Sequence, residues 1–210
     1  MIIRRAAVIG DIHAEDDRLA AILDYCGPRG LDAVLCTGDI VDGSGDADRC
    51  ARLLADARVI CVRGNHDRWL VGGDQVETSR FLREFLASLP STYVFDTSMG
   101  RALLCHGVGT NDMRRLTPDD FGYALTSNDE LQELIRSKYS VVVGGHTHRS
   151  MVRRLGGLVF VNPGTLLRGL TDPPCPAAFA IIDFERGDVE MMAVDNDLVI
   201  RCVEKINLTA

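Results

Sequence analysis

The first 65 residues alternate short apolar runs with amphipathic segments. Residues 6–9, 33–36 and 59–62 are apolar runs with the length of buried strands. Between them, apolar side chains recur at helical spacing, at Leu19, Ile22, Leu23 and Cys26 and then at Cys50, Leu53, Leu54 and Ala57. Gly27-Pro28 is expected to end the first helix. This βαβαβ order predicts a parallel sheet covered by helices.

The second half of the chain favours β structure. Two more helices are predicted, one over residues 81–89 and one around Leu131 and Leu134, where Ser127 and Glu130 form a capping box. The other apolar runs have strand length and cover residues 102–105, 141–143, 151–155, 158–161, 177–183 and 189–194. Gly156-Gly157 and Arg186-Gly187 are hairpin signals, so antiparallel strands are expected there. Residues 107–126 show neither period and are expected to form an active-site loop or small cap.

Composition and charge narrow the class of protein. The 210 residues, 46% of them apolar, suit a single domain over residues 1–210. The net charge of −7 opposes binding to a polyanion, so we expect no nucleic-acid partner. No apolar run approaches the roughly 18 residues that cross a bilayer, and the N-terminus does not resemble a secretory leader. The seven cysteines are scattered along the chain, which indicates reduced thiols. Together these features predict a cytoplasmic protein with no membrane partner.

All five histidines lie next to the ends of predicted strands, and none lies on a predicted helix. Each belongs to or follows a polar cluster, and the clusters are Gly10-Asp11-Ile12-His13, Gly38-Asp39-Ile40-Val41-Asp42, Gly64-Asn65-His66-Asp67, Cys105-His106-Gly107 and Gly144-Gly145-His146-Thr147-His148. Because the carboxyl ends of parallel strands form one ligand-binding edge, these residues are expected to converge. Their carboxylate, amide and imidazole donors suit Mn²⁺, Fe or Zn²⁺ rather than a cysteine-rich structural zinc site.

In this order, the clusters resemble the motifs of the calcineurin-like metallophosphoesterases, which read DxH, GDxxD, GNHD/E, a lone His and GHxH. The resemblance implies an α/β fold, a four-layer α/β/β/α sandwich of mixed sheets with two metal ions at the carboxyl edge. Asn162-Pro163-Gly164-Thr165 resembles the NPGS segment of the small bacterial phosphodiesterase branch, and an ordinary turn is the alternative.

The resemblance also implies a role for each site residue. Asp11, His13, Asp39 and His148 would hold the first ion, and Asn65, His106 and His146 the second, with Asp39 bridging. Mn²⁺ is the expected metal, with Fe, Zn²⁺ or Ni²⁺ as alternatives. His66 would not be a ligand but would protonate the leaving oxygen or hold a phosphoryl oxygen.

Residues around these ligands receive weaker assignments. Asp42 would orient His66, and loop capping is its alternative role. Asp67 is expected to brace its loop. Arg63, Arg149 and Arg168 lie near the motifs in sequence and are candidates to bind a substrate phosphate, with solvated surface positions as the alternative.

The activity implied is hydrolysis of a small phosphodiester by attack of a metal-bridging hydroxide. A phosphomonoesterase or protein phosphatase is the first alternative, although protein phosphatases read GDxVDRG and here Asp42 is followed by Gly43-Ser44-Gly45. A non-catalytic scaffold of the same fold would have a degraded metal site, whereas every motif position here is filled. Nucleases with these motifs carry additional domains and basic grooves. The C-terminal strands could offer an edge for a homo-oligomer, which stays open.

Overall fold

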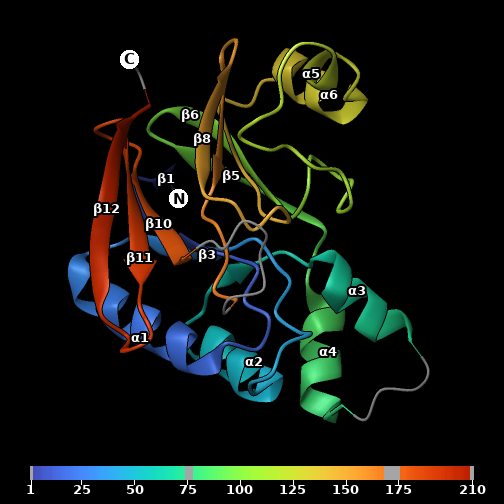
Figure 1. The fold of residues 1–210 in the computed structure, drawn as a ribbon, viewed down its shortest axis with the longest axis vertical. Helices are drawn as coiled ribbons and strands as arrows, with labels where there is room; N and C mark the ends of the chain where they lie inside the picture. The colour runs from blue at the N-terminus through green and yellow to red at the C-terminus, as the bar shows by residue number, and fades with distance from the viewer. Residues whose placement is uncertain (1, 74–77, 168–175, 209–210) are drawn as a thin grey trace.

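Two six-stranded mixed sheets pack face to face in the computed structural model, which describes residues 2–73, 78–167 and 176–208 (Figure 1). Sheet I has the strand order β12-β11-β10-β2-β3-β4. Its strands β2, β3 and β4 run parallel, and β10, β11 and β12 are added antiparallel. The bounds of these strands are Arg5–Ile9, Ala33–Cys36, Ile60–Cys61, Ala177–Asp183, Asp188–Val194 and Ile200–Asn207.

Sheet II has the strand order β1-β5-β6-β7-β9-β8. Its strands, from β1 and β5 to β9, are Ile2–Ile3, Thr92–Thr97, Gly100–Cys105, Val141–Val143, Met151–Leu155 and Leu158–Asn162. Strands β6, β7 and β9 are parallel neighbours, so β6 and β7 end at the same edge. The predicted hairpins β8–β9 and β10–β11 are both present.

Side-chain alternation along the strands separates the layers. In β2, Ala7 and Ile9 pack with helices α1 (Asp16–Cys26) and α2 (Ala47–Asp56), whereas Ala6 and Val8 face sheet II. In β6, Leu103 and Cys105 pack with helix α6 (Asp129–Arg136), whereas Ala102 and Leu104 face sheet I. Three apolar cores therefore separate four layers, and the predicted α/β/β/α sandwich is confirmed.

Helix α3 (Asn65–Gly72) was not expected, and it precedes the predicted helix α4 (Arg80–Ser88). The expectation that no histidine lies on a helix is therefore wrong, because His66 is in the first turn of α3. The buried positions of α3 are Asn65, Asp67 and Leu70. Two of these three are polar, so the helix lacks the apolar period by which the other helices were predicted.

Several boundaries differ from the sequence prediction. Strand β4 is shorter than residues 59–62, and β1, β5 and β12 were not predicted. The expected cap Ser127 is replaced by Asn128, whose Oδ1 accepts the Leu131 backbone N–H at 3.1 Å. A 3₁₀ turn (Gly27–Arg29) follows α1 and places Gly27-Pro28 at the helix end, as predicted.

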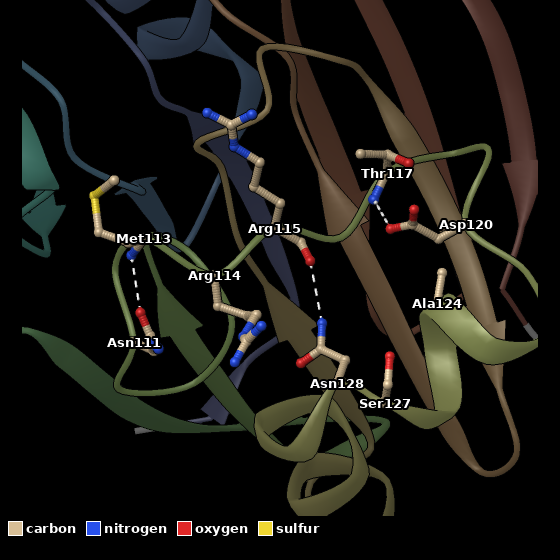
Figure 2. Close-up of a pocket in the computed structure, with 9 residues that line it drawn as sticks. All are labelled: Asn111, Met113, Arg114, Arg115, Thr117, Asp120, Ala124, Ser127 and Asn128. Atoms are coloured by element: carbon tan, nitrogen blue, oxygen red, sulfur yellow. Dashed lines mark hydrogen bonds between the residues drawn. The ribbon is translucent and has the colours of Figure 1, made fainter.

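The segment 107–126 contains one short helix, α5 (Tyr123–Thr126), and is otherwise irregular. With the start of α6 it encloses a pocket of about 560 Å³, lined by Asn111, Met113, Arg114, Arg115, Thr117, Asp120, Ala124, Ser127 and Asn128 (Figure 2).

Six of the seven cysteines lie in the described residues, and all six are free thiols. Five are buried and Cys202 is exposed, while Cys175 falls outside the described residues. Within the described ranges, every helix is too short or too polar to cross a membrane.

Candidate metal centre

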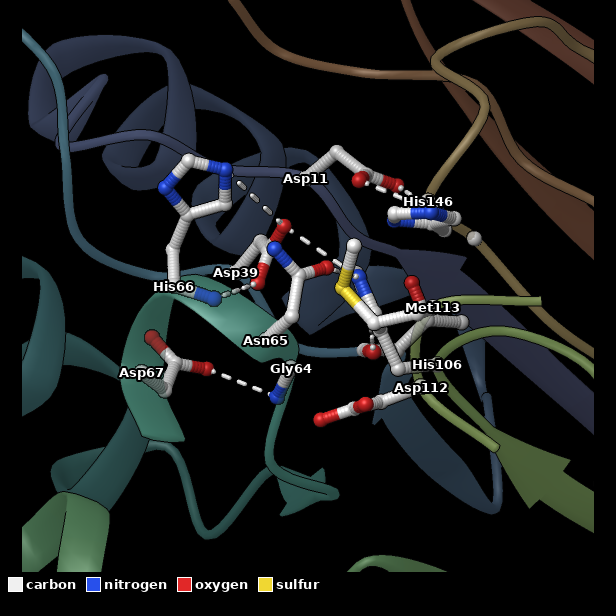
Figure 3. A network of polar contacts seen from close by, with 12 residues as sticks. Asp11, Asp39, Gly64, Asn65, His66, Asp67, His106, Asp112, Met113 and His146 are labelled. Carbon is white, nitrogen blue, oxygen red and sulfur yellow. Dashed lines mark hydrogen bonds and ion pairs between the residues drawn. The ribbon is translucent and has the colours of Figure 1, made fainter. Parts of the chain in front are cut away.

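The four segments that carry the five histidines meet where strands of the two sheets end. Asp11 and Asp39 follow β2 and β3 of sheet I, whereas His106 and His146 follow β6 and β7 of sheet II. Figure 3 shows these four side chains and Asn65 directed toward one another. The convergence expected from the sequence is thus present, although it joins the edges of two sheets rather than one.

Two triads of donor atoms form within this cluster, and in each the atoms lie within 4.8 Å of one another. The first triad is Asp11, His13 and His148, and the second is Asp39, His106 and His146. In the first, Nε2 of His148 lies 3.1 Å from Nε2 of His13 and 3.3 Å from Oδ1 of Asp11.

In the second triad, Nε2 of His106 lies 3.2 Å from Oδ2 of Asp39. The same nitrogen lies 2.9 Å from Oδ1 of Asn65, so the amide oxygen lies directly beside this triad. The other carboxylate oxygen of Asp39, Oδ1, accepts the backbone N–H of His66 at 2.9 Å. Oδ2 is therefore the Asp39 oxygen directed into the cluster.

The imidazole rings are oriented as cation ligands. Nδ1 of His13 donates to the carbonyl oxygens of Val41 and Asp42 at 3.1 Å each, and Nδ1 of His106 donates to that of Thr37 at 2.9 Å. Because a carbonyl only accepts, each Nδ1 carries a proton, and the Nε2 of each ring is the nitrogen that faces the cluster. Nε2 of His146 is buried and has no hydrogen-bond partner among the described residues. These donors fit two divalent cations.

Electrostatics point the same way. Burial lowers the pKa of His13, and burial together with the nearby charge of His106 lowers the pKa of His146 to about 4, so both rings stay neutral. Burial opposes a charge on His106, but its hydrogen bond to Asp39 prevails and raises the His106 pKa to about 9. A cation bound between this imidazole and the carboxylate would take the place of the shared proton.

The backbone of the cluster is strained. Five residues of the two triads have positive φ angles: Asp11 at 47°, His13 at 48°, Asp39 at 52°, His146 at 69° and His148 at 59°. Such conformations cost free energy and persist where surrounding contacts enforce them, typically at functional sites. Two glycines leave the necessary room, because a Cβ on Gly64 would lie 2.1 Å from Asp39 Oδ1 and one on Gly145 would lie 2.5 Å from Asp11 Oδ2.

His66 lies beside the triads without belonging to either. Its Nδ1 contacts Oδ2 of Asp42 at 2.6 Å, and its Nε2 lies 4.0 Å from Oδ2 of Asp39. The ring packs edge-on against Trp69, with 4.8 Å between centroids, and against His13 at 5.1 Å. His66 is therefore held on three sides, with one nitrogen facing the cluster.

A second layer of side chains supports the loops. Asp67 accepts the backbone N–H groups of Ile40 at 2.8 Å and Gly64 at 3.0 Å, as expected of a brace. Burial and the charge of Asp39 raise the pKa of Asp67 to about 6. In the Asn162–Thr165 segment, Asn162 donates to the carbonyl of Gly145 at 2.8 Å and Thr165 to that of Asp11 at 2.7 Å. This segment is thus more than an ordinary turn, because it holds two ligand-bearing loops.

The predicted arginines are less informative. Arg149 forms an ion pair with Asp119 of the 107–126 segment, the backbone N–H of Arg63 donates to Pro90 at 2.8 Å, and Arg168 lies outside the described residues. Their phosphate-binding roles stay predictions. Two further residues near the cluster, Trp69 and Arg115, were not predicted from the sequence. The signal for Trp69 was its position three residues after His66, which is helical spacing. The signal for Arg115 was the basic pair Arg114-Arg115 in the predicted active-site loop.

Comparison with known proteins gives the family. The profile of the calcineurin-like phosphoesterase superfamily domain matches residues 5–187. The uncharacterized protein MJ0912 of Methanocaldococcus jannaschii is 34% identical over 77 residues, which is 37% of this chain. The matched segment spans only 32% of that relative, about a third of its length.

Three solved structures share the fold. A metallophosphoesterase from Sphaerobacter thermophilus superimposes with a TM-score of 0.71 at 20% identity, over 91% of this chain and 88% of its own. Yfce, a phosphoesterase from E. coli, gives 0.61 at 19% identity over 98% and 100%. Vps29 from Entamoeba histolytica, complexed with Zn²⁺, gives 0.60 at 20% identity over 98% and 99%. At these identities the likeness concerns the fold, while the profile match spans most of the chain. The chain therefore belongs to the calcineurin-like phosphoesterase superfamily.

Proposed function

We propose that this protein is a binuclear metal-dependent phosphoesterase that hydrolyses a small phosphodiester. One observation carries the proposal: two triads of carboxylate and imidazole donors lie side by side, and carbonyl contacts on two of the rings turn their free nitrogens into the cluster. A scaffold protein would have no need to hold five ligands in strained backbone conformations.

The ligands divide between two cations. Asp11, His13 and His148 would hold one ion, Asn65, His106 and His146 the other, and Asp39 would bridge them through Oδ2. Mn²⁺ is the metal we propose, because the donors are oxygen and imidazole nitrogen without thiolate. Such a pair of ions supplies positive charge for an anionic phosphate and Lewis-acid activation of the phosphoryl group and the attacking water.

The residues of the chain supply orientation and a proton. His66 stands beside the cluster with Nδ1 bound to Asp42, so Nε2 is the atom that can deliver a proton to the leaving oxygen. Asp42 fixes the ring and stabilises its protonated form, as carboxylates do for other catalytic imidazoles. A leaving alkoxide needs such a proton. The presence of a proton donor therefore supports a substrate whose leaving group is an unactivated alcohol.

A screen with metal-stripped protein tests the proposal. Bis(p-nitrophenyl) phosphate, p-nitrophenyl phosphate and cyclic nucleotides would each be assayed with Mn²⁺, Fe²⁺, Zn²⁺ and Ni²⁺. We expect the diester to be hydrolysed with the higher kcat/KM. A higher value for the monoester would make the protein a phosphomonoesterase, and absence of any turnover with two ions bound would favour a scaffold.

A further inference from the structure

The part of the 107–126 segment nearest the metal centre is irregular but firmly held. Arg68 of α3 contacts Asp112 at 2.6 and 3.1 Å. At the start of α6, Glu130 accepts from Arg114 at 2.8 Å, and Nδ2 of Asn128 donates to the Arg115 carbonyl at 3.1 Å. Arg153 of β8 donates to the carbonyls of Thr117 at 2.7 Å and Asp120 at 2.8 Å. Leu116 of the same segment is buried. The direction in which Arg115 leaves the backbone is therefore fixed.

Arg115 differs from the arginines around it. Arg68, Arg114 and Arg149 each pair with a carboxylate, namely Asp112, Glu130 and Asp119. The guanidinium of Arg115 is exposed and has no hydrogen-bond or ion-pair partner within residues 2–73, 78–167 and 176–208. Figure 2 shows it extended away from Asn128, on the opposite side of the backbone from that contact.

Arg115 lies between the metal centre and the neighbouring pocket. It borders the pocket of about 560 Å³ beside α5 and α6. Its backbone also runs close to the cluster, because a Cβ on Gly107, the residue after His106, would lie 2.7 Å from the carbonyl oxygen of Arg114. A molecule that spans the distance from cluster to pocket therefore crosses the stretch of chain that carries Arg115.

The pocket suits a polar, anionic group. Its lining contains two arginines, Arg114 and Arg115, and the polar residues Thr117, Ser127, Asn111 and Asn128. The carboxylate in its lining, Asp120, accepts the backbone N–H of Thr117 at 2.8 Å. The volume falls in the range of small-molecule sites.

We propose that Arg115 and this pocket bind the part of the substrate beyond the scissile phosphate, and that this part carries a second anionic group. The inference rests on the proposed phosphoesterase function. The two cations would hold the scissile phosphate, whereas the unpaired guanidinium of Arg115 is a fork-shaped donor set matched to a second phosphate or a carboxylate. Arg115 is thus a specificity residue for doubly anionic substrates.

Two diesters that differ only in the second charge test this. The p-nitrophenyl ester of thymidine 5′-phosphate would be compared with its 3′-phosphorylated form, so the leaving group is the same. We expect wild-type kcat/KM to be about 10- to 100-fold higher for the 3′-phosphorylated ester, mainly through KM. Arg115→Ala should abolish this preference and leave the other ester within about 2-fold. Arg115→Lys should keep part of the preference for the 3′-phosphorylated ester. The control variant Arg136→Ala removes an exposed positive charge at the end of α6 and should keep the whole preference.

Direct binding provides a readout independent of turnover. Trp69 is the one tryptophan of the chain and lies beside His66, so its fluorescence can report binding of thymidine 3′,5′-bisphosphate and thymidine 5′-phosphate to the metal-loaded protein. Arg115→Ala should weaken the bisphosphate alone. Equal kcat/KM for the two esters, or an equal loss for both in Arg115→Ala, would overturn the inference and leave the proposed function standing. Failure of the wild type to hydrolyse either ester would overturn the proposed function, and the binding comparison would then decide the role of Arg115.

Discussion

Nδ1 of His66 lies 2.6 Å from Oδ2 of Asp42, and neither residue belongs to the two donor triads. The imidazole comes from the first turn of α3, whereas the carboxylate comes from the loop after β3. Cation binding and proton donation are thus assigned to different side chains, and variants can separate them.

We expect His66→Ala to keep both metal ions while turnover falls by roughly 10² to 10⁴, the usual effect of losing a general acid. The loss should be largest for esters with poor leaving groups, because nitrophenolate needs little protonation. His106→Ala should instead lose metal first. Metal content and kcat measured for both variants decide this, and equal metal loss in the two would make His66 a ligand.

Asp42→Asn should lower kcat by about 10-fold or more, because the amide stabilises a protonated imidazole less well than a carboxylate does. If Asp42 acts only through His66, the double variant His66→Ala/Asp42→Asn should be no slower than His66→Ala. Additive losses in this double-mutant cycle would show a separate role for Asp42, such as capping its loop.

Asp39→Asn should reduce the occupancy of both metal sites together. Oδ1 of Asp39 is engaged by the His66 backbone, so Oδ2 is left for both cations. Asp11→Asn should affect chiefly the site of His13 and His148. Metal analysis of the two purified variants gives the comparison, and normal occupancy of either site in Asp39→Asn would contradict the bridging role.

Chelation should abolish activity and also lower the Tm. The ligands come from loops of both sheets, so cations bound to the native state alone stabilise their packing by about 2.7 kcal/mol at a free concentration of 100 Kd. Differential scanning calorimetry with EDTA and with Mn²⁺ tests this. The His66→Ala variant, which should retain its metals, is the control and should show the same shift.

Asp32→Asn should destabilise the protein by about 1 kcal/mol or less. The Asp32 carboxylate accepts the backbone N–H groups of Arg5 at 3.0 Å and Arg4 at 2.7 Å, which lowers its pKa below the usual 3.8. A lowered native pKa contributes stability above pH 4 that is lost as the pH falls further. Urea unfolding at pH 7 and pH 3 should therefore show a smaller difference between wild type and variant at the acidic pH.

The sequence was most informative where burial follows a simple period. Strands β3 and β10 were predicted with their observed bounds, because apart from Asp183 at the end of β10 all their side chains are apolar. Strand β12 escaped prediction because most of its side chains are exposed and it pairs only with β11. Helix α3 escaped because its buried face is polar, and that face is part of the candidate site.

The candidate site shows a similar division. The motif residues from Asp11 to His148 could be assembled by resemblance, since motifs mark the loops that carry the ligands. Arg115 and Trp69 belong to none of these motifs, and their closeness to the cluster depends on how the 107–126 segment and α3 fold next to it. Distances between loops of different sheets are set by tertiary packing and have no counterpart in local sequence.

The first nine residues contribute to both sheets, β1 to sheet II and β2 to sheet I. During synthesis, β2 can pair with β3 (Ala33–Cys36) early, but its other neighbour, β10, ends at Asp183. Until the ribosome has released that segment, the apolar strand at the centre of sheet I has an open edge to which another chain could add. Strand β1 likewise waits for β5 (Thr92–Thr97). Residues 2–9 are thus made well before the strands that complete their pairing, and nascent chains that stall before Asp183 should be the most prone to aggregate.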